Sequence, residues 1–300
     1  MRYRVSHTTE YRYDDSVYES HNELRLSPLA TPLQRVHRFE VRSEPRARMF
    51  SYHDWLGNVV HYFNVHPIHE RLTIRAESVV SVSPRPKSDV WRQVAVGDFR
   101  RERDRLRETY YEFLAPSTRV PALEAWRDLA PDIDAAGDGE ALYDLVSEAF
   151  ARVHARLAYD RDATRADTPV DRVLALGRGS SKDFSHVLIG ALRGLGVPTR
   201  YVSGYGFHLG EPGAEAPPGA SGRPFPFLSH AWVEAFLPGV GWCGIDPTHA
   251  RPVDLRYVKV AVGRDYDDVV PVKGVFRGSG RQDLGVFIEM WSVPEREEVD

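Results

Sequence analysis

Residues 230–246 read HAWVEAFLPGVGWCGID, and this pattern predicts a β-hairpin with its turn at Pro238-Gly239. In an antiparallel pair that turns near Gly239, we expect the first residue, His230, to lie roughly opposite the last, Asp246. Directly opposed side chains have Cβ atoms about 4.5–5.5 Å apart, so a carboxylate there can fix the tautomer of an imidazole and support its charged form. The hairpin therefore predicts two members of a catalytic triad.

The chain contains one cysteine, Cys243, and it lies inside this hairpin. One thiol can neither form an internal disulfide nor supply a cysteine-rich zinc site, so the fold has to rest on its hydrophobic core. Residues two apart on a strand share a face, so Cys243 and Ile245 should point away from the face that carries Asp246. We therefore expect Cys243 to be a small buried hydrophobic residue and not a nucleophile.

Upstream of the hairpin, residues 181–195 form the clearest predicted helix. Its apolar residues recur at three- and four-residue spacing on one stripe: Phe184, Val187, Leu188, Ala191, Leu192 and Leu195. Residues 180–183 are typical of a capping box, and Gly196 ends the helix. Unsatisfied N–H groups and the positive end of the helix dipole lower the pKa of a thiol at such a start and can bind an oxyanion. The residue there is Ser181, which a plain helix cap would also explain.

Farther outward, the chain divides into two parts. Residues 3–82 alternate polar and apolar side chains between turn signals, which predicts an antiparallel β-sandwich-like domain over residues 1–83. A proline-broken stretch predicts a linker over residues 84–98. Residues 99–300 show helical spacing and then strands, which predicts a core of helices packed on an antiparallel sheet with further C-terminal strands. The predicted fold class is therefore α+β.

The charge balance restricts the partners. The chain of 300 residues carries 43 acidic and 39 basic side chains, with a net charge of -4. It lacks the basic footprint of a protein that binds nucleic acid or an anionic membrane. No apolar run is long enough for a secretory signal or a membrane helix, so we expect a cytoplasmic protein.

Three histidines are candidate zinc ligands by their spacing in the sequence: His61, His66 and His69. A proline interrupts them and no cysteine assists, so a metal site is not expected there. The sequence predicts no metal and no cofactor.

Four motifs, in order along the chain, resemble the core of bacterial transglutaminase-like proteins. They are GSSKDFSH at 179–186, TRYVSGY at 199–205, SHAWVE at 229–234 and GWCGIDPT at 241–248. The β-rich N-terminal segment, with DWLGN at 54–58, resembles the domain that commonly precedes this core. A further likeness to the tail of this family lies in VAVGRDY at 260–266 and PVKGV at 271–275. The resemblance spans nearly the whole chain.

This resemblance implies a papain-like thiol mechanism, in which a cysteine at the helix start attacks an amide carbonyl, a histidine manages the proton and an aspartate orients the histidine. His230 matches the histidine and Asp246 the aspartate. Ser181 stands where the family has cysteine, and Lys182 where it usually has glutamine. A helix N-terminus and an imidazolium can ionise a thiol but not an alcohol, so a thiolate site that holds serine should lose most of its rate.

Five further residues are expected to bind substrate or to support the triad: Lys182, Asp183, His186, Tyr205 and Trp232. The expected role of His186 is packing or a supporting hydrogen bond, and that of Trp232 is hydrophobic packing. A Ser-Lys dyad through Lys182 is disfavoured because adjacent helical residues point roughly 100° apart.

Three functions stay open from the sequence. The first is a catalytically silenced transglutaminase-like protein that binds a peptide or protein partner in the cleft. The second is an active hydrolase or acyltransferase that uses Ser181 on amide or ester bonds. The third is a transglutaminase-like cysteine protease whose cysteine was changed to serine, although one such change leaves Lys182 unexplained. The first accounts for both departures from the family pattern.

Overall fold

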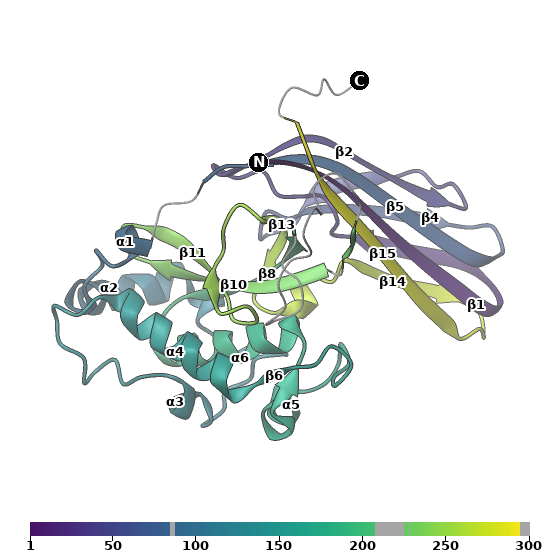
Figure 1. Ribbon diagram of the computed structural model, residues 1–300. Helices are drawn as coiled ribbons and strands as arrows, with labels where there is room; N and C mark the ends of the chain where they lie inside the picture. The colour runs from purple at the N-terminus through teal and green to yellow at the C-terminus, as the bar shows by residue number, and fades with distance from the viewer. Residues whose placement is uncertain (85–87, 208–224, 228, 295–300) are drawn as a thin grey trace.

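A curled antiparallel sheet of eight strands forms the N-terminal part of the protein in the computed structural model, which describes residues 1–84, 88–207, 225–227 and 229–294. Its strands are β1 (Arg2–Leu24), β2 (Gln34–Glu44), β3 (Phe50–His53), β4 (Val59–Val65), β5 (His69–Val82), β9 (Phe225–Phe227), β14 (Val272–Arg277) and β15 (Gln282–Val293). The first half of β1 pairs with β5 and β15, and its second half pairs with β4 and β14 (Figure 1). Strand β1 therefore organises the sheet.

Alternate side chains of β1 are buried, which is the period-two spacing that the sequence shows. Tyr3 and Val5 are buried whereas Arg4 between them is exposed. The interior of the curl is filled by a cluster that includes Tyr11, Tyr13, Leu24, Phe63, Leu72 and Ile74. Burying each large apolar side chain contributes about 1.5–3 kcal/mol, which stabilises the curled sheet. The α+β prediction, with a β-rich N-terminal domain before a core of helices on a sheet, is confirmed.

The C-terminal strands lie elsewhere than the predicted division suggests. That division placed residues 99–300 in one core domain, but β14 and β15 pair along β1 and so belong to the N-terminal sheet. In Figure 1 they are the yellow strands that run beside the purple β1. The reason is that β1 has backbone N–H and C=O groups along both of its edges. Strands β4 and β5 pair with one edge only, and β14 and β15 pair with the other.

The predicted linker at 84–98 is in large part packed structure, although residues 85–87 lie outside the described residues. Helix α1 (Ser88–Trp91) lies within it, and α2 (Val96–Thr109) starts before its end. Trp91, Val94 and Val96 are buried in the core cluster. The linker prediction was therefore wrong over its second half, because burial of a tryptophan and two valines outweighs the entropy of a free segment.

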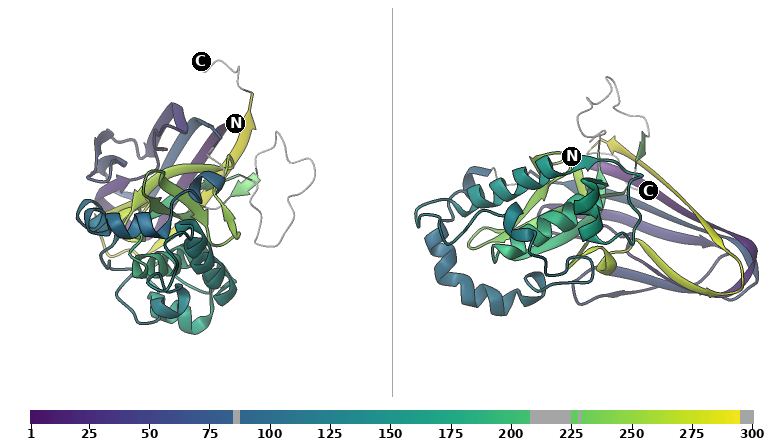
Figure 2. Two further views of the ribbon diagram at one scale, coloured as in Figure 1. Left: turned by 90° about the vertical axis from the view of Figure 1, so that its left-hand side faces the viewer. Right: turned by 90° about the horizontal axis from the view of Figure 1, so that it is seen from below.

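The core contains a five-stranded antiparallel sheet in the order β12-β11-β10-β8-β13. These strands are β8 (Thr199–Gly206), β10 (Ser229–Leu237), β11 (Gly241–Asp246), β12 (Arg251–Pro252) and β13 (Tyr257–Gly263). The remaining elements are α3 (Trp126–Leu129), α4 (Leu142–Arg156), α5 (Val170–Leu176), α6 (Ser181–Gly194), the short strands β6 (Ala158–Tyr159) and β7 (Arg178–Gly179), and the 3-10 turns η1 (Tyr111–Phe113) and η2 (Tyr266–Asp268). Seen from below, the helices lie at one end of the molecule and the N-terminal sheet at the other (Figure 2, right).

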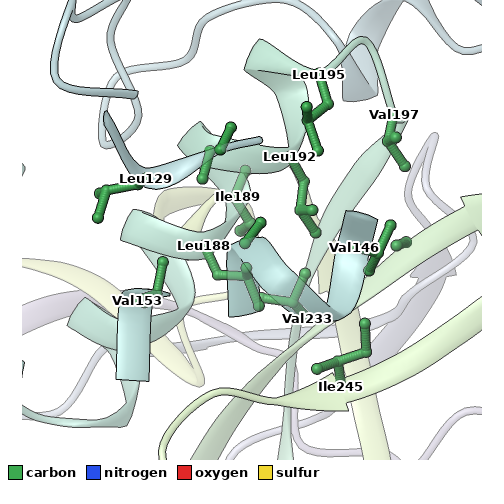
Figure 3. Close-up of a cluster of buried hydrophobic side chains, with 14 of the residues drawn as sticks. Leu129, Val146, Val153, Leu188, Ile189, Leu192, Leu195, Val197, Val233 and Ile245 are labelled. Carbon is green, nitrogen blue, oxygen red and sulfur yellow. The ribbon is translucent and has the colours of Figure 1, made fainter. Parts of the chain in front are cut away.

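Helix α6 is the centre of the core, and its bounds match the predicted helix closely. Figure 3 shows Leu188, Ile189 and Leu192 of α6 gathered with Val233 of β10 and Ile245 of β11. These side chains are almost fully buried. The apolar stripe of α6 therefore holds the start of the helix against the hairpin. Within the described residues, no helix is long and apolar enough to cross a membrane.

Two side-chain amides of the N-terminal part bind β13, an edge strand of the core sheet. Gln34 accepts a hydrogen bond from the N–H of Lys259 at 2.8 Å and donates one to its carbonyl at 2.7 Å. Asn58 makes the same pair of bonds with Val262, both at 2.8 Å. An open edge exposes unpaired backbone groups on which another strand could pair, and these amides satisfy four such groups.

A buried histidine joins the same two parts. His7 of β1 is 2 % exposed, and its Nδ1 lies 2.9 Å from the hydroxyl of Tyr205 in β8. Apolar side chains from both parts surround this pair, including Tyr3, Val80 and Val258. Burial lowers the pKa of His7 to about 4, so the ring is neutral near pH 7.

Acidification is expected to weaken this joint. The unfolded chain takes up a proton on His7 near pH 6.5, whereas the folded protein resists it down to about pH 4. Stability is therefore full above pH 6.5 and falls between pH 6.5 and 4, with a contribution from His7 of about 3 kcal/mol. Urea unfolding of the parent and of His7→Asn across this range should show a shallower decline for the variant. His21→Asn, which alters an exposed histidine, is the control, and equal slopes for parent and His7→Asn would contradict the assignment.

Candidate functional site

The hairpin brings His230 and Asp246 together. Nε2 of His230 lies 2.7 Å from Oδ2 of Asp246. The register pairs Val233 with Ile245 and Leu237 with Gly241, which aligns Asp246 with position 232 and not with 230. The expectation that His230 and Asp246 lie roughly opposite was thus off by two residues, because a loop of three residues centred on Gly239 places position 232, and not 230, opposite Asp246. His230 reaches Asp246 along the diagonal of the same face.

The Asp246 carboxylate is fully buried and accepts hydrogen bonds from five donors. Oδ2 faces His230, Nδ1 of His249 at 2.9 Å and the hydroxyl of Tyr257 at 2.7 Å. Oδ1 accepts from the backbone N–H groups of Thr248 at 2.9 Å and His249 at 3.3 Å. Burial alone would raise the pKa of this carboxyl, but the charge of His230 and the bonds from the two histidines hold it well below its usual range.

This arrangement defines the tautomer of His230. Since Nε2 faces a carboxylate, Nε2 carries the hydrogen and Nδ1 is the nitrogen that can accept a proton. His230 is partly exposed, with 11 % of its side chain accessible, whereas Asp246 is inaccessible. Asp246 therefore acts as a buried group that orients the ring, and His230 is a base that solvent or substrate can reach.

Sequence reasoning missed His249 and Tyr257. His249 follows Asp246 by three residues, and its own N–H bonds to the Asp246 carboxylate in the turn after β11. An aspartate that starts a Pro-containing turn is a signal from which this contact could have been predicted. Tyr257 opens β13, a different strand, and no local pattern links it to Asp246.

Ser181 is the first residue of α6, as predicted, and it is partly buried. The first N–H groups of a helix have no acceptor within the helix, so they remain available to an anion. The carbonyl of Ser181 accepts a hydrogen bond from Ser185 Oγ at 2.8 Å. Helix α6 packs on β10, which carries His230. Within the described residues, however, Ser181 and His230 share no hydrogen bond.

The start of α6 is fastened by Asp183. Its Oδ2 accepts the backbone N–H of Ser180 at 2.8 Å, the hydroxyl of Ser180 at 3.1 Å and the hydroxyl of Thr164 at 2.5 Å. Lys182 Nζ donates to Asp183 Oδ1 at 2.5 Å and to Thr164 Oγ1 at 3.1 Å. A Cβ at Gly179 would lie 2.7 Å from Asp183, so glycine is required there. Lys182 is thus bound to Asp183 and Thr164, which disfavours a dyad with Ser181.

Two of the predicted supporting residues bind neighbouring elements. His186 accepts the N–H of Tyr266 on Nε2 at 3.2 Å, and burial lowers its pKa to about 3. It therefore stays neutral and attaches η2 to α6. The Tyr205 hydroxyl bonds to His7 at the joint between the two parts, so this hydroxyl is not directed at Asp246.

Trp232 and Cys243 lie on opposite faces of the hairpin. The ring of Trp232 is 6.3 Å from that of His230 and inclined by 28°, and it is fully buried. It therefore supports the imidazole while also filling the core. Cys243 is buried in the apolar cluster under the helices, opposite Ala235. The only thiol of the chain thus faces away from His230, as the strand parity predicts.

Beside the start of α6 is a cavity of about 450 Å³. Its walls are residues 158–162 and 176–178, which include β6 and the first residue of β7. Charges of both signs line it, with Arg178 3.6 Å from Asp160. The chain passes from this wall through Gly179 and Ser180 directly to Ser181. The cavity therefore lies on the segments that immediately precede the start of α6 in the chain.

Two family descriptions match this sequence. Residues 3–81 match the bacterial transglutaminase-like N-terminal region, and residues 127–247 match the transglutaminase-like superfamily. A protein of Mycobacterium leprae is 33 % identical over 293 residues, which is 96 % of this chain and 98 % of the relative. A protein-glutamine gamma-glutamyltransferase of Pseudomonas aeruginosa is 28 % identical over 138 residues, which is 41 % of this chain and 20 % of the relative.

The fold has a counterpart among solved structures. A presumptive cysteine protease from Cytophaga hutchinsonii superposes with a TM-score of 0.75 at 18 % identity, covering 98 % of this chain and 92 % of that one. At this identity the likeness concerns the fold, and it includes both the curled N-terminal sheet and the helical core.

Proposed function

This chain belongs to the bacterial transglutaminase-like proteins, and from that premise we propose that it is a catalytically silenced member that binds a peptide or protein partner beside Ser181. One observation carries the proposal. Ser181 occupies the start of α6, where the resemblance to the family implies a cysteine, and in the described part of the chain it has no hydrogen bond to His230.

The chemistry of the hydroxyl supports silencing. A thiol with a pKa near 8.5 becomes a thiolate at a helix start beside an imidazolium, and the thiolate then attacks without further help. An alcohol needs its proton removed during the attack, which requires a direct bond from the hydroxyl to a base. Without that bond Ser181 is a weak nucleophile. The site can then still bind an acyl group although it cleaves that group poorly.

The cavity beside α6 supports a chain-like partner. Asp160, Arg161 and Arg178 line it with charges of both signs, and it lies next to Ser180 and Ser181 in the chain. Polar walls of mixed charge suit the amide groups and charged side chains of an extended peptide. Lys182 stands at the helix start, paired with Asp183, where the resemblance to the family implies a neutral glutamine.

A second function is favoured by the intact pair of His230 and Asp246. A separation of 2.7 Å, a buried carboxylate and a partly exposed ring are the arrangement of a working general base. In this alternative, Nδ1 of His230 takes the proton of Ser181 as its Oγ attacks an amide or ester carbonyl. The oxyanion then lies at the N–H groups of α6, and His230 returns the proton to the leaving group.

Labelling with a fluorophosphonate distinguishes the two functions. We expect no adduct on Ser181 by mass spectrometry after exposure to the reagent, because a silenced site does not activate its hydroxyl. The variants Ser181→Ala and His230→Ala show the background, and Ser229→Ala, which alters an exposed serine beside His230, is the matched control. An adduct on Ser181 that disappears in His230→Ala would overturn silencing and establish the serine enzyme.

A further inference from the structure

His230, Asp246 and His249 form a cluster that can bind a metal ion. One atom from each, a ring nitrogen or a carboxylate oxygen, lies within 4.8 Å of the other two. Zinc binds histidine nitrogen and carboxylate oxygen at about 2.0–2.2 Å, so tetrahedral ligands lie about 3.4 Å apart. The separations of 2.7 and 2.9 Å between Asp246 and the two histidines need to widen by about 0.5–0.7 Å.

We propose that these three side chains bind one divalent zinc ion, with its fourth position open to water. Two imidazoles and one carboxylate are a ligand set that zinc uses in sites with an open position. The three residues come from β10, the end of β11 and the turn after it, so the hairpin brings them together before any ion arrives. Zinc binding here requires neither acyl transfer nor a thiol.

The groups around the cluster already hold the ligands in place. The N–H groups of Thr248 and His249 fix Asp246 Oδ1, and the hydroxyl of Tyr257 bonds to Oδ2. Such supporting bonds orient metal ligands and raise affinity. The side chains of His230 and His249 are 11 % and 7 % accessible, so bulk water competes little for the ion.

An unpartnered hydroxyl gives an independent indication of a missing group. Thr248 Oγ1 is buried and has no hydrogen-bond partner within the described residues. Thr248 directly precedes His249 in the turn, and its backbone N–H bonds to Asp246 Oδ1. Buried hydroxyls are nearly always paired, and a water molecule on the ion would supply a partner here.

Zinc would also change the chemistry of His230. A neutral imidazole that binds the ion through Nε2 carries its hydrogen on Nδ1, so Nδ1 becomes a donor and no longer accepts a proton. The metal-bound form is therefore unable to activate Ser181. Zinc binding would therefore help to silence Ser181, but the proposal that zinc binds does not depend on Ser181 being silenced.

Metal binding is measured on the full chain after chelator treatment and desalting. We expect one Zn²⁺ per chain by calorimetry at neutral pH, and Co²⁺ should give the visible absorption of a four- or five-coordinate site. Tyr257→Phe removes a bond that supports a ligand and should weaken zinc binding about 10- to 100-fold. His249→Ala removes a ligand and should weaken binding by more than this. His21→Ala is the control. Ser181→Ala should bind as the parent does, which separates this result from any result on the serine.

Two outcomes would overturn the proposal. One is the absence of stoichiometric Zn²⁺ and Co²⁺ binding by the parent. The other is binding of unchanged affinity in both His249→Ala and His249→Gln, with circular dichroism showing that each variant is folded. The glutamine variant keeps a polar side chain in the turn, so a folding defect in the alanine variant alone does not decide the question.

Discussion

Ser181→Cys is expected to create a thiol that iodoacetamide alkylates rapidly at pH 6, where an ordinary thiol hardly reacts. The start of α6 and the ring of His230 both favour a thiolate, and helix starts with a histidine partner lower a thiol pKa from about 8.5 to between about 3.5 and 7.5. At pH 6 this raises the thiolate fraction about 100-fold for a pKa near 6. The pH profile of the alkylation rate is the measurement.

The controls for this experiment are within the chain. Cys243 is 2 % exposed and should stay unlabelled in the parent, so it sets the background. Ser229→Cys places a thiol at an exposed position beside His230 and should show an ordinary profile. Adding His230→Ala to Ser181→Cys should remove most of the reactivity at low pH. A profile with an apparent pKa near 8.5 for Ser181→Cys would refute the idea that the thiolate site survives.

Glu234→Gln should cost about 3–5 kcal/mol of unfolding free energy, because it leaves the buried Lys259 and the partly buried Arg200 without their anion. Glu234 is fully buried, and its Oε2 accepts two hydrogen bonds from Arg200 at 2.9 and 2.7 Å. Its Oε1 lies 2.5 Å from Lys259 Nζ. Burial would raise the pKa of Glu234, but Lys259 and Arg200 lower it to about 2.

Urea unfolding of Glu234→Gln and the parent at pH 7 measures this effect. Glu40→Gln is the matched control, because Glu40 pairs with Arg42 on the surface and should change stability by less than about 1 kcal/mol. The pairing also predicts a pH effect. The folded pKa lies below the unfolded value, so this stabilisation is present above about pH 4.5 and is lost as the pH falls toward 2. A loss of stability no larger than that of Glu40→Gln would show that water reaches the cluster.

Local patterns predicted the elements that carry the site. The stripe from Phe184 to Leu195 identified α6, and alternation identified the hairpin, because both signals depend on neighbours within one element. The same parity placed Cys243 away from His230. The register was wrong by two residues although the turn lies at Gly239, because a turn centred there pairs position 232 with Asp246.

Contacts between distant segments were not predictable in this way. Tyr257 bonds to Asp246 only because β13 lies in the same sheet as β11, and nothing near Tyr257 in the sequence indicates that. The pairing of β15 with β1 joins residues about 280 positions apart. The burial of Trp91 depends likewise on a core that the local sequence does not describe.

The position of β1 has a consequence for synthesis of the protein on the ribosome. One side of β1 is completed by β4 and β5, which are made soon after it, but the other side is completed by β14 and β15, which are made near the end. For most of translation, therefore, a strand of 23 residues keeps one side of its backbone unpaired. Unpaired strand edges on nascent chains invite association with other chains. A message truncated before codon 272 would make this exposure permanent, so its product should aggregate even though the helical core is complete.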